Sequence, residues 1–367
     1  MHAQPSAQAL AAMHNLTSRF FRRGLVIALI GGALYGLYSA FLLRGTSVGV
    51  WAEWYDPDQK VLTAFTVIYV LGMLGSGIND LISAVWMVGI AGVKGKIADV
   101  LRCVKTKPGA VMALCAVIGG PIANGAYIIA LQMMGPISAA ITALCPAIGA
   151  IIARLLFKQQ LNARMIVGIT VCFGAALLIS SEAFRGVTVD TNFLLGMAIA
   201  FIAALGWGIE GAVAGFGTSV MDYEIGISIR QTVSGASTLV IAVPVLALVA
   251  GNIALAPELT FKALASGPSL PWFLLSGLCA GLSFGLWYKG NSMCGTALGM
   301  ACNATYSFWV PLFTWLFLGL ILGQEGLAMG VWQWVAAFLM VIGIFLIAVN
   351  PITFVRDLLG RSQSTEV

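Results

Sequence analysis

Long apolar stretches separated by short polar breaks run along nearly the whole chain. A helix needs about 20 apolar residues to cross a hydrocarbon layer about 30 Å thick, and each stretch is close to that length. The second stretch continues to Val93, so we expect its helix to be tilted, broken or preceded by an interfacial segment. The ten predicted membrane helices are 24–43, 61–92, 109–132, 136–157, 163–181, 193–214, 226–250, 271–290, 296–321 and 330–349.

Composition supports a membrane protein over a soluble one. Of the 367 residues, 60% are apolar and only 9% are charged, and the mean hydropathy is +0.96. One soluble core cannot hide that much apolar surface, so the excess is expected to face lipid. The predicted fold class is therefore an all-α polytopic membrane protein with ten transmembrane helices.

The pattern of the apolar helices repeats once along the chain. Pro146 lies in an apolar helix and is followed fourteen residues later by Gln160 and another apolar helix; Pro311 and Glu325 repeat this spacing. A fixed long-range offset indicates an internal duplication, and in membrane proteins such repeats are often inverted. We predict two inverted five-helix repeats at 22–181 and 193–351, a linker at 182–192, and cytoplasmic tails at 1–21 and 352–367.

The positive charges predict an orientation. With the N-terminus inside, fifteen lysines and arginines fall on or toward the cytoplasmic side, Arg230 and Lys289 among them. Four fall outside: Arg44, Lys60, Arg185 and Lys262. This asymmetry follows the positive-inside rule and places both termini in the cytoplasm, with the plasma (inner) membrane as the expected location. The net charge of +5 thus orients the protein and implies no nucleic-acid partner.

Two acidic residues lie inside apolar stretches. Asp80 precedes Lys94 by fourteen residues, about 21 Å of helix, which places its carboxyl near mid-membrane. Glu210 follows Trp207 in a helix crowded with glycines. A carboxylate in the bilayer costs several kcal/mol unless it is protonated, paired or hydrated, so both acids are functional candidates. A structural pair with an interior partner is the alternative.

Further polar and aromatic side chains are candidates to line a cavity around these acids. The run Gly119-Gly120-Pro121 should interrupt its helix near Asn124, freeing carbonyl groups that need partners, although a simple kink is the alternative. The predicted substrate-contacting residues are Asp80, Trp86, Asn124, Tyr127, Trp207, Glu210, Trp287, Tyr288, Asn303 and Tyr306. The residues predicted for coupling or charge pairing are Asp80, Glu210, Arg230 and Lys289, with snorkelling to the interface as the alternative for Lys289.

The external loop from Gly45 to Lys60 is aromatic and acidic, and it includes Trp51 and Trp54. An interfacial aromatic belt is the first interpretation. A lid that gathers cationic or aromatic substrates is the alternative.

Two five-helix halves, each ending in a proline-bearing helix, a short turn and a glycine-bearing helix, resemble the drug/metabolite transporter superfamily, specifically its ten-helix EamA-type members. The resemblance covers roughly residues 22–351. The family's Leu-Gly-Glu turn is present as Leu322-Gly323-Gln324-Glu325 with one residue inserted, and the first half has Phe157-Lys158-Gln159-Gln160 without the glutamate. The resemblance implies a central cavity between inverted halves that opens alternately to either face.

The expected function is secondary transport of a small polar metabolite, because carboxylates and aromatic faces both attract a cation or zwitterion such as an amino acid or quaternary amine. An organic anion or nucleotide sugar bound by Arg230 and Lys289 is one alternative, and a non-transporting receptor or scaffold is another. The only histidines are His2 and His14, and no metal-ligand spacing occurs, so we expect neither an enzyme nor a cofactor or metal. The expected partners are the small-molecule substrate and the bilayer, with a homodimer left open.

Overall fold

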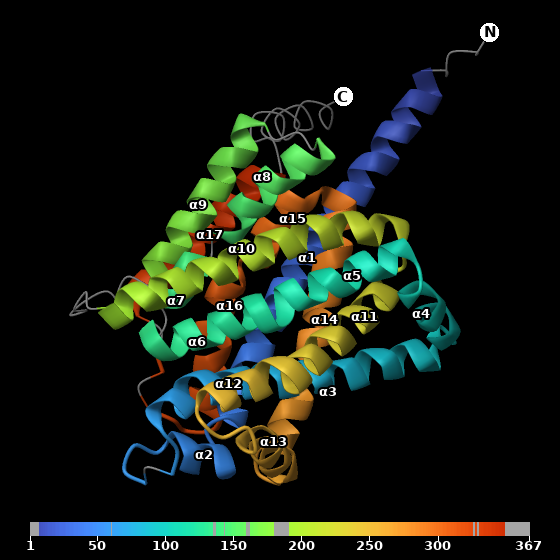
Figure 1. Ribbon diagram of the computed structural model, residues 1–367. Helices are drawn as coiled ribbons and strands as arrows, with labels where there is room; N and C mark the ends of the chain where they lie inside the picture. Colours follow the sequence, from blue (N-terminus) through green and yellow to red (C-terminus); the bar gives the residue numbers. More distant parts are fainter. Residues whose placement is uncertain are drawn as a thin grey trace.

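The computed structural model describes residues 7–59, 61–134, 137–142, 144–158, 162–179, 191–325, 327–328 and 330–348. Within these ranges every regular element is a helix. Gln160, nearly all of the expected 182–192 linker and the whole 352–367 tail lie outside the described residues. The expected tail at 1–21 is helical from Ala7, because the first helix begins there and runs without a break into the apolar stretch (Figure 1).

The helices of the first half are α1 (Ala7–Gly45), α2 (Val50–Tyr55), α3 (Leu71–Val93), α4 (Ile97–Val104), α5 (Lys107–Val117), α6 (Gly125–Met134), α7 (Ile137–Thr142), α8 (Cys145–Phe157) and α9 (Ala163–Ile179). Those of the second half are α10 (Thr191–Val220), α11 (Tyr223–Ser237), α12 (Val243–Val249), α13 (Leu255–Ala265), α14 (Leu270–Cys294), α15 (Thr296–Asn303), α16 (Tyr306–Phe313) and α17 (Val331–Ala348).

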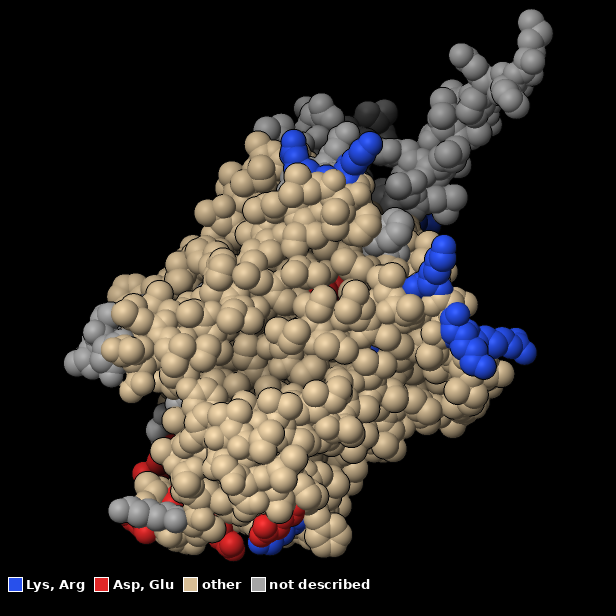
Figure 2. Space-filling view, in the orientation of Figure 1, with Lys and Arg blue, Asp and Glu red and all other residues tan. Residues whose placement is uncertain are grey.

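Several of these helices are long and apolar enough to cross a bilayer, which makes the protein a polytopic membrane protein. In the described part of the chain seven such spans occur, at Arg19–Gly45, Thr66–Val93, Lys107–Ala130, Thr191–Val220, Tyr223–Val249, Leu270–Cys294 and Thr296–Ile321. Three shorter apolar helices, Cys145–Phe157, Ala163–Leu178 and Val331–Gly343, lie where three further crossings were predicted. Figure 2 shows lysines and arginines along the upper and right edges of the molecule, acidic side chains along the lower edge, and a broad uncharged surface between.

Four spans contain a wider π-helical turn instead of a break. The segment around Pro121 was predicted to interrupt its helix, but Ile118–Asn124 is a π-helix (η2) that joins α5 to α6. A π-turn accommodates the proline because each N–H then reaches a carbonyl five residues back. The long second stretch begins with another π-helix at Thr66–Val70 (η1), and Thr238–Ala242 (η4) and Thr314–Ile321 (η5) complete the set.

Helices of the two halves pack against each other throughout the bundle. α1 packs along α14, and α10 packs along α5, η2 and α6. α3 lies against both α11 and α14, while α9 packs on α17 (Figure 1). The core is therefore shared by both halves, and side chains far apart in sequence meet in its centre.

Close crossing of α3 and α11 depends on a glycine. A Cβ added to Gly235 would lie 2.6 Å from the backbone nitrogen of Leu81, which is closer than real Cβ atoms approach. The backbones of α3 and α11 therefore meet only because no side chain stands between them.

Two indoles in the connection between the first two spans are buried, which neither interpretation of its sequence foresaw. α2 carries Trp51, which is 0% exposed, and Trp54, which is 5% exposed. The ring of Trp51 lies 5.4 Å from that of Phe273 on α14, and Ser269 Oγ donates to the carbonyl of Val48 at 2.8 Å. The loop is thus part of the packed core and does not present a belt of exposed indoles.

Candidate functional site

An arginine and two carboxylates from three different helices meet in the interior of the bundle. Arg230 Nε on α11 lies 2.8 Å from Glu210 Oε1 on α10, and Arg230 Nη1 lies 3.4 Å from Asp80 Oδ2 on α3. The three side chains are each 0% exposed. The sequence analysis counted Arg230 on or toward the cytoplasmic side and also named it for charge pairing. Arg230 follows Asp222 by eight residues, which is about 12 Å along the helix.

Polar residues spaced three or four apart place this cluster between α3 and α11. On α3 the polar positions are Ser76, Asp80 and Ser83; on α11 and the following turn they are Gln231, Ser234 and Thr238. Such spacing puts each set on one face of its helix. Gln231 Nε2 donates to Ser83 Oγ, and Ser234 Oγ donates to Asp80 Oδ2. These hydrogen bonds fix the register of the two helices beside Arg230.

Two residues of α14 complete the cluster. The hydroxyl of Tyr288 donates to Glu210 Oε1, which also accepts from Arg230. The guanidinium carbon of Arg230 lies 4.1 Å from the ring centroid of Phe284, a cation–π contact. Two carboxylates face one guanidinium, so the cluster carries one excess negative charge whenever both acids are ionised.

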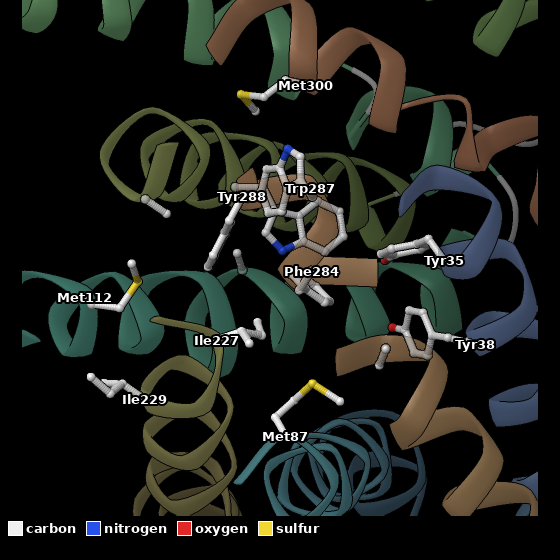
Figure 3. Packing of buried hydrophobic residues seen from close by; sticks show 14 of the residues in the cluster. Tyr35, Tyr38, Met87, Met112, Ile227, Ile229, Phe284, Trp287, Tyr288 and Met300 are labelled. Atoms are coloured by element: carbon white, nitrogen blue, oxygen red, sulfur yellow. The ribbon is translucent and has the colours of Figure 1, made fainter. Parts of the chain in front are cut away.

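Aromatic rings adjoin the charged cluster. Tyr35 of α1 packs on Tyr306 with ring centroids 4.5 Å apart and meets Trp207 edge to face at 6.5 Å. Tyr127 lies 5.2 Å from Trp207. Figure 3 shows Trp287, Tyr288 and Phe284 grouped together, with the rings of Tyr35 and Tyr38 directed toward Phe284. The predicted aromatic residues Tyr127, Trp207, Trp287, Tyr288 and Tyr306 therefore belong to one core, shared by helices of both halves.

Several buried polar atoms in this core have no hydrogen-bond partner among the described residues. They include the indole nitrogens of Trp207 and Trp287, both amide atoms of Asn124, Oδ1 of Asn303 and Oδ1 of Asp80. Buried polar groups are normally satisfied, and each exception costs about 1–3 kcal/mol unless water or a ligand fills the position. Indole N–H groups can only donate, whereas the oxygens of Asp80 and Asn303 accept. The core therefore offers both donors and acceptors to a small polar molecule.

Two of the predicted site residues lie apart from this core. Trp86 is 39% exposed, and its indole nitrogen donates to the carbonyl of Leu274 at 3.0 Å on the outside of the bundle. Lys289 Nζ lies 4.4 Å from the ring centroid of Tyr223 and forms no ion pair with Asp80 or Glu210. The structure therefore separates Trp86 and Lys289 from the acids, and Lys289 agrees with the alternative of a lysine reaching the interface.

A second charged cluster lies at one end of the bundle, where α3 ends and α11 begins. Lys94 pairs with Glu224, and Lys96 Nζ lies 2.8 Å from Asp222 Oδ2 and 2.6 Å from Glu224 Oε2. Burial alone would raise the pKa of Asp222, but hydrogen bonds from Lys96 and from the backbone N–H of Glu224 outweigh it and lower that pKa below its usual range. The hydrogen bond to Asp222 in turn raises the pKa of Lys96. We call these four side chains the end cluster.

Sequence reasoning missed several members of the central site. Ser83, Ser234 and Gln231 were not singled out as ligands, and neither were Tyr35 or Phe284. One signal was available for Ser234, because Arg230, Ser234 and Thr238 recur every four residues and so share one face of their helix. Tyr35 was not singled out, because its partners Tyr306 and Trp207 come from distant helices.

Comparisons with known proteins identify the fold but no activity. The chain matches no family model and no curated protein. Solved structures do match it, including a chain described only as "Crystal structure of protein", with a TM-score of 0.62 and 17% sequence identity over 88% of this chain and 95% of that one. At that identity the likeness shows a shared fold over most of both chains.

Proposed function

We propose that this protein is a secondary transporter of the ten-helix EamA type that moves a small polar metabolite, an amino acid or a quaternary amine, across the plasma membrane by alternating access. The observation that carries the proposal is the triad of Asp80, Arg230 and Glu210, each 0% exposed inside apolar spans. Charged groups at such a depth are expensive, and in membrane proteins they mark pathways for ions and substrates.

The packing of the helices supports two inverted repeats. If α1, α3, the α5 to α6 span, the α7 to α8 span and α9 correspond to α10, α11, α14, the α15 to α16 span and α17, several of the main contacts map onto one another. α1 on α14 corresponds to α10 on α5 and α6, and α3 on α14 corresponds to α11 on α5. The pairs α3 with α11, α8 with α15, and α9 with α17 map onto themselves. A pseudo-two-fold axis with the charged cluster beside it is the arrangement used for alternating access.

The surface charges favour the proposed orientation. Lysines and arginines lie along the upper and right edges in Figure 2, and an uncharged surface separates them from the lower edge, where acidic residues lie with a basic side chain beside them. The positive-inside rule favours a cytoplasmic location for the end that carries more basic residues, and we propose that both termini are cytoplasmic.

The chemistry of the core favours a cation or zwitterion as substrate. The excess negative charge of the triad attracts a positive group, and the surrounding aromatic faces stabilise an ammonium group further. The indole N–H groups of Trp207 and Trp287 are available to an acceptor such as a carboxylate. The core is less suited to bind an organic anion, because Arg230 already pairs with both acids and Lys289 contacts Tyr223 instead.

Transport in proteoliposomes tests the proposal. Purified protein should exchange a radiolabelled amino acid or quaternary amine from a panel that also contains nucleotide sugars and organic anions. Asp80→Asn and Glu210→Gln should each lower the rate at least about tenfold while the protein remains folded. Glu258→Gln is the matched control, because Glu258 is 49% exposed and pairs only with Lys262 at the periphery.

Four outcomes would contradict the proposal. Wild-type rates in both acid variants would remove the triad from the pathway. Substrate binding without flux would indicate a receptor, and conversion of a panel compound into a product would indicate an enzyme. Stabilisation of the purified protein by anions alone would show that the substrate is an anion and not the proposed cation or zwitterion.

A further inference from the structure

The excess negative charge of the triad is localised on one oxygen. Both oxygens of Glu210 are bonded, Oε1 to Arg230 and Tyr288 and Oε2 to Arg230 at 3.5 Å. Asp80 Oδ2 accepts from Ser234 and Arg230, whereas Asp80 Oδ1 has no partner among the described residues. An unpaired carboxylate oxygen buried in a membrane protein is costly unless a proton, water or a cation meets it.

Two hydroxyl groups without partners in the described part of the chain lie one helical turn from Asp80. α3 and α11 run in opposite directions, and hydrogen bonds join Ser83 to Gln231 and Asp80 to Ser234. One turn further along both helices, the next facing positions are Ser76 and Thr238. A Cβ on Gly77 would lie 2.8 Å from Thr238 Cγ2, so the helices are in contact at this level.

The hydroxyls of Ser76 and Thr238 differ from the other hydroxyls of these helices. Ser228, Thr232 and Ser237 on α11 each donate to the carbonyl four residues earlier, at 2.6 to 2.8 Å. Ser76 Oγ and Thr238 Oγ1 make no such bond and have no other partner in the described part of the chain, although the side chains are 1% and 0% exposed. Two buried hydroxyls and a carboxylate oxygen are thus unsatisfied at the same crossing.

We propose that Asp80 Oδ1, Ser76 Oγ and Thr238 Oγ1 bind a sodium ion. Na⁺ is a hard cation that binds oxygen ligands, and its single charge would neutralise the excess negative charge of the triad. The site lies where the two proposed repeats cross, and Thr238 begins the π-helix η4, an irregularity of the kind found at functional sites. The ion's role in coupling rests on the proposed transport function, whereas its binding does not.

Binding is measured on the purified full-length protein without substrate. Thermal stability is followed as NaCl replaces KCl at constant total salt, and wild-type protein should show a saturable rise in Tm that follows Na⁺ occupancy. Thr238→Val, which keeps the shape but removes the hydroxyl, and Ser76→Ala should raise the apparent Kd for Na⁺ at least about tenfold. Thr238→Ser, which retains the hydroxyl, and Ser237→Ala, which alters only a bond to α11's own backbone, should behave as wild type.

Several results would overturn the site. An identical Tm in NaCl and KCl, together with no equilibrium binding of radiolabelled Na⁺ to the wild-type protein, would exclude it without any variant. An unchanged Na⁺ dependence in both hydroxyl variants would place the ion elsewhere. A Tm that does not respond to Na⁺, together with a pH dependence that Asp80→Asn removes, would assign a proton to Asp80.

Transport measurements then distinguish a failure of the sodium site from a failure of the proposed transport function. An inward Na⁺ gradient should accelerate uptake by wild-type proteoliposomes at least about fivefold over an equal K⁺ gradient, an effect that Thr238→Val should abolish. An uptake rate that does not depend on the Na⁺ gradient would overturn the coupling role and leave the transporter proposal intact. Na⁺ binding without any transport would retain the site and reject the transporter.

Discussion

The guanidinium Nε of Arg230 lies 2.8 Å from Oε1 of Glu210, and both side chains are 0% exposed. The two residues are on consecutive long helices, α10 and α11, whereas the second acid bound by Arg230 is on α3. A single arginine thus connects the two halves of the chain at the centre of the bundle. Its planar, multiply donating head suits this role better than a lysine, which is a point charge.

We expect Arg230→Gln to destabilise the protein strongly. Removing one partner of a buried ion pair costs about 3–5 kcal/mol, because the remaining charges are left uncompensated. Arg230→Lys should recover only part of the loss, since one ammonium group cannot reproduce the bonds to both carboxylates. The measurement is the free energy of unfolding in mixed micelles. Combining Arg230→Gln with Glu210→Gln should restore stability relative to Arg230→Gln alone, and an additive further loss would contradict the pairing.

Tyr288→Phe should weaken the same cluster more mildly. The Tyr288 hydroxyl donates to Glu210, and a hydrogen bond to a charged group contributes about 1.5–3 kcal/mol. Unfolding measurements should show a loss in that range with little change in packing. Tyr69→Phe is the matched control, because the Tyr69 hydroxyl meets only the sulfur of Met133 at 4.0 Å. Equal losses of unfolding free energy in the two variants would mean that the hydrogen bond to Glu210 stabilises the fold no more than the Tyr69 contact does.

Much of the fold follows from the apolar pattern, because a bilayer requires long apolar helices whatever their tertiary packing. The predicted stretches 24–43 and 271–290 lie within the observed spans Arg19–Gly45 and Leu270–Cys294. The stretch around Pro121 was misjudged because a proline removes one donor but does not end a helix that can widen into a π-turn. The inverted repeat stays a prediction.

The site was harder to read from sequence than the fold. Asp80 and Glu210 were identified because a carboxylate inside an apolar stretch is conspicuous, and Arg230 was named for charge pairing although it was also counted on or toward the cytoplasmic side. Trp86 lies six residues beyond Asp80, which is about 120° around the helix, so helical geometry already directs it away from the acid. Pairings across helices depend on tertiary packing and have no sequence pattern of their own.

Gly235→Ala should separate α3 from α11. A Cβ at this position would lie 2.6 Å from the nitrogen of Leu81 and 3.0 Å from the carbonyl carbon of Asp80, and backbone atoms cannot move aside cheaply. We expect a loss of about 1–3 kcal/mol from overpacking, together with loss of Na⁺-dependent stabilisation. Gly89→Ala on α3 is the control, because nothing lies within 4 Å of its added Cβ, and alanine favours the helix by about 0.5–1 kcal/mol. Equal effects of the two substitutions on unfolding would contradict the close crossing.

The end cluster predicts a dependence of stability on acid pH. Lys96 and the backbone of Glu224 lower the pKa of Asp222 in the folded protein, whereas an unfolded aspartate titrates near pH 4. The stability that ionised Asp222 contributes to the folded state is therefore complete above about pH 4. It disappears as the pH falls through the lower pKa that Asp222 has in the folded state. Because the Asp222 side chain is 39% exposed, the contribution should stay below about 1 kcal/mol.

Asp222→Asn tests this dependence, because an asparagine cannot be protonated in this range. Between pH 6 and pH 3 the Tm of the wild type should fall more than that of Asp222→Asn, and the two curves should converge at the acid end. Asp99→Asn is the matched control, since Asp99 is 55% exposed and pairs only with Arg102 on the same helix at 3.4 Å. If Asp222→Asn loses stability on acidification as steeply as the wild type, then the bond between Lys96 and Asp222 does not stabilise the folded state.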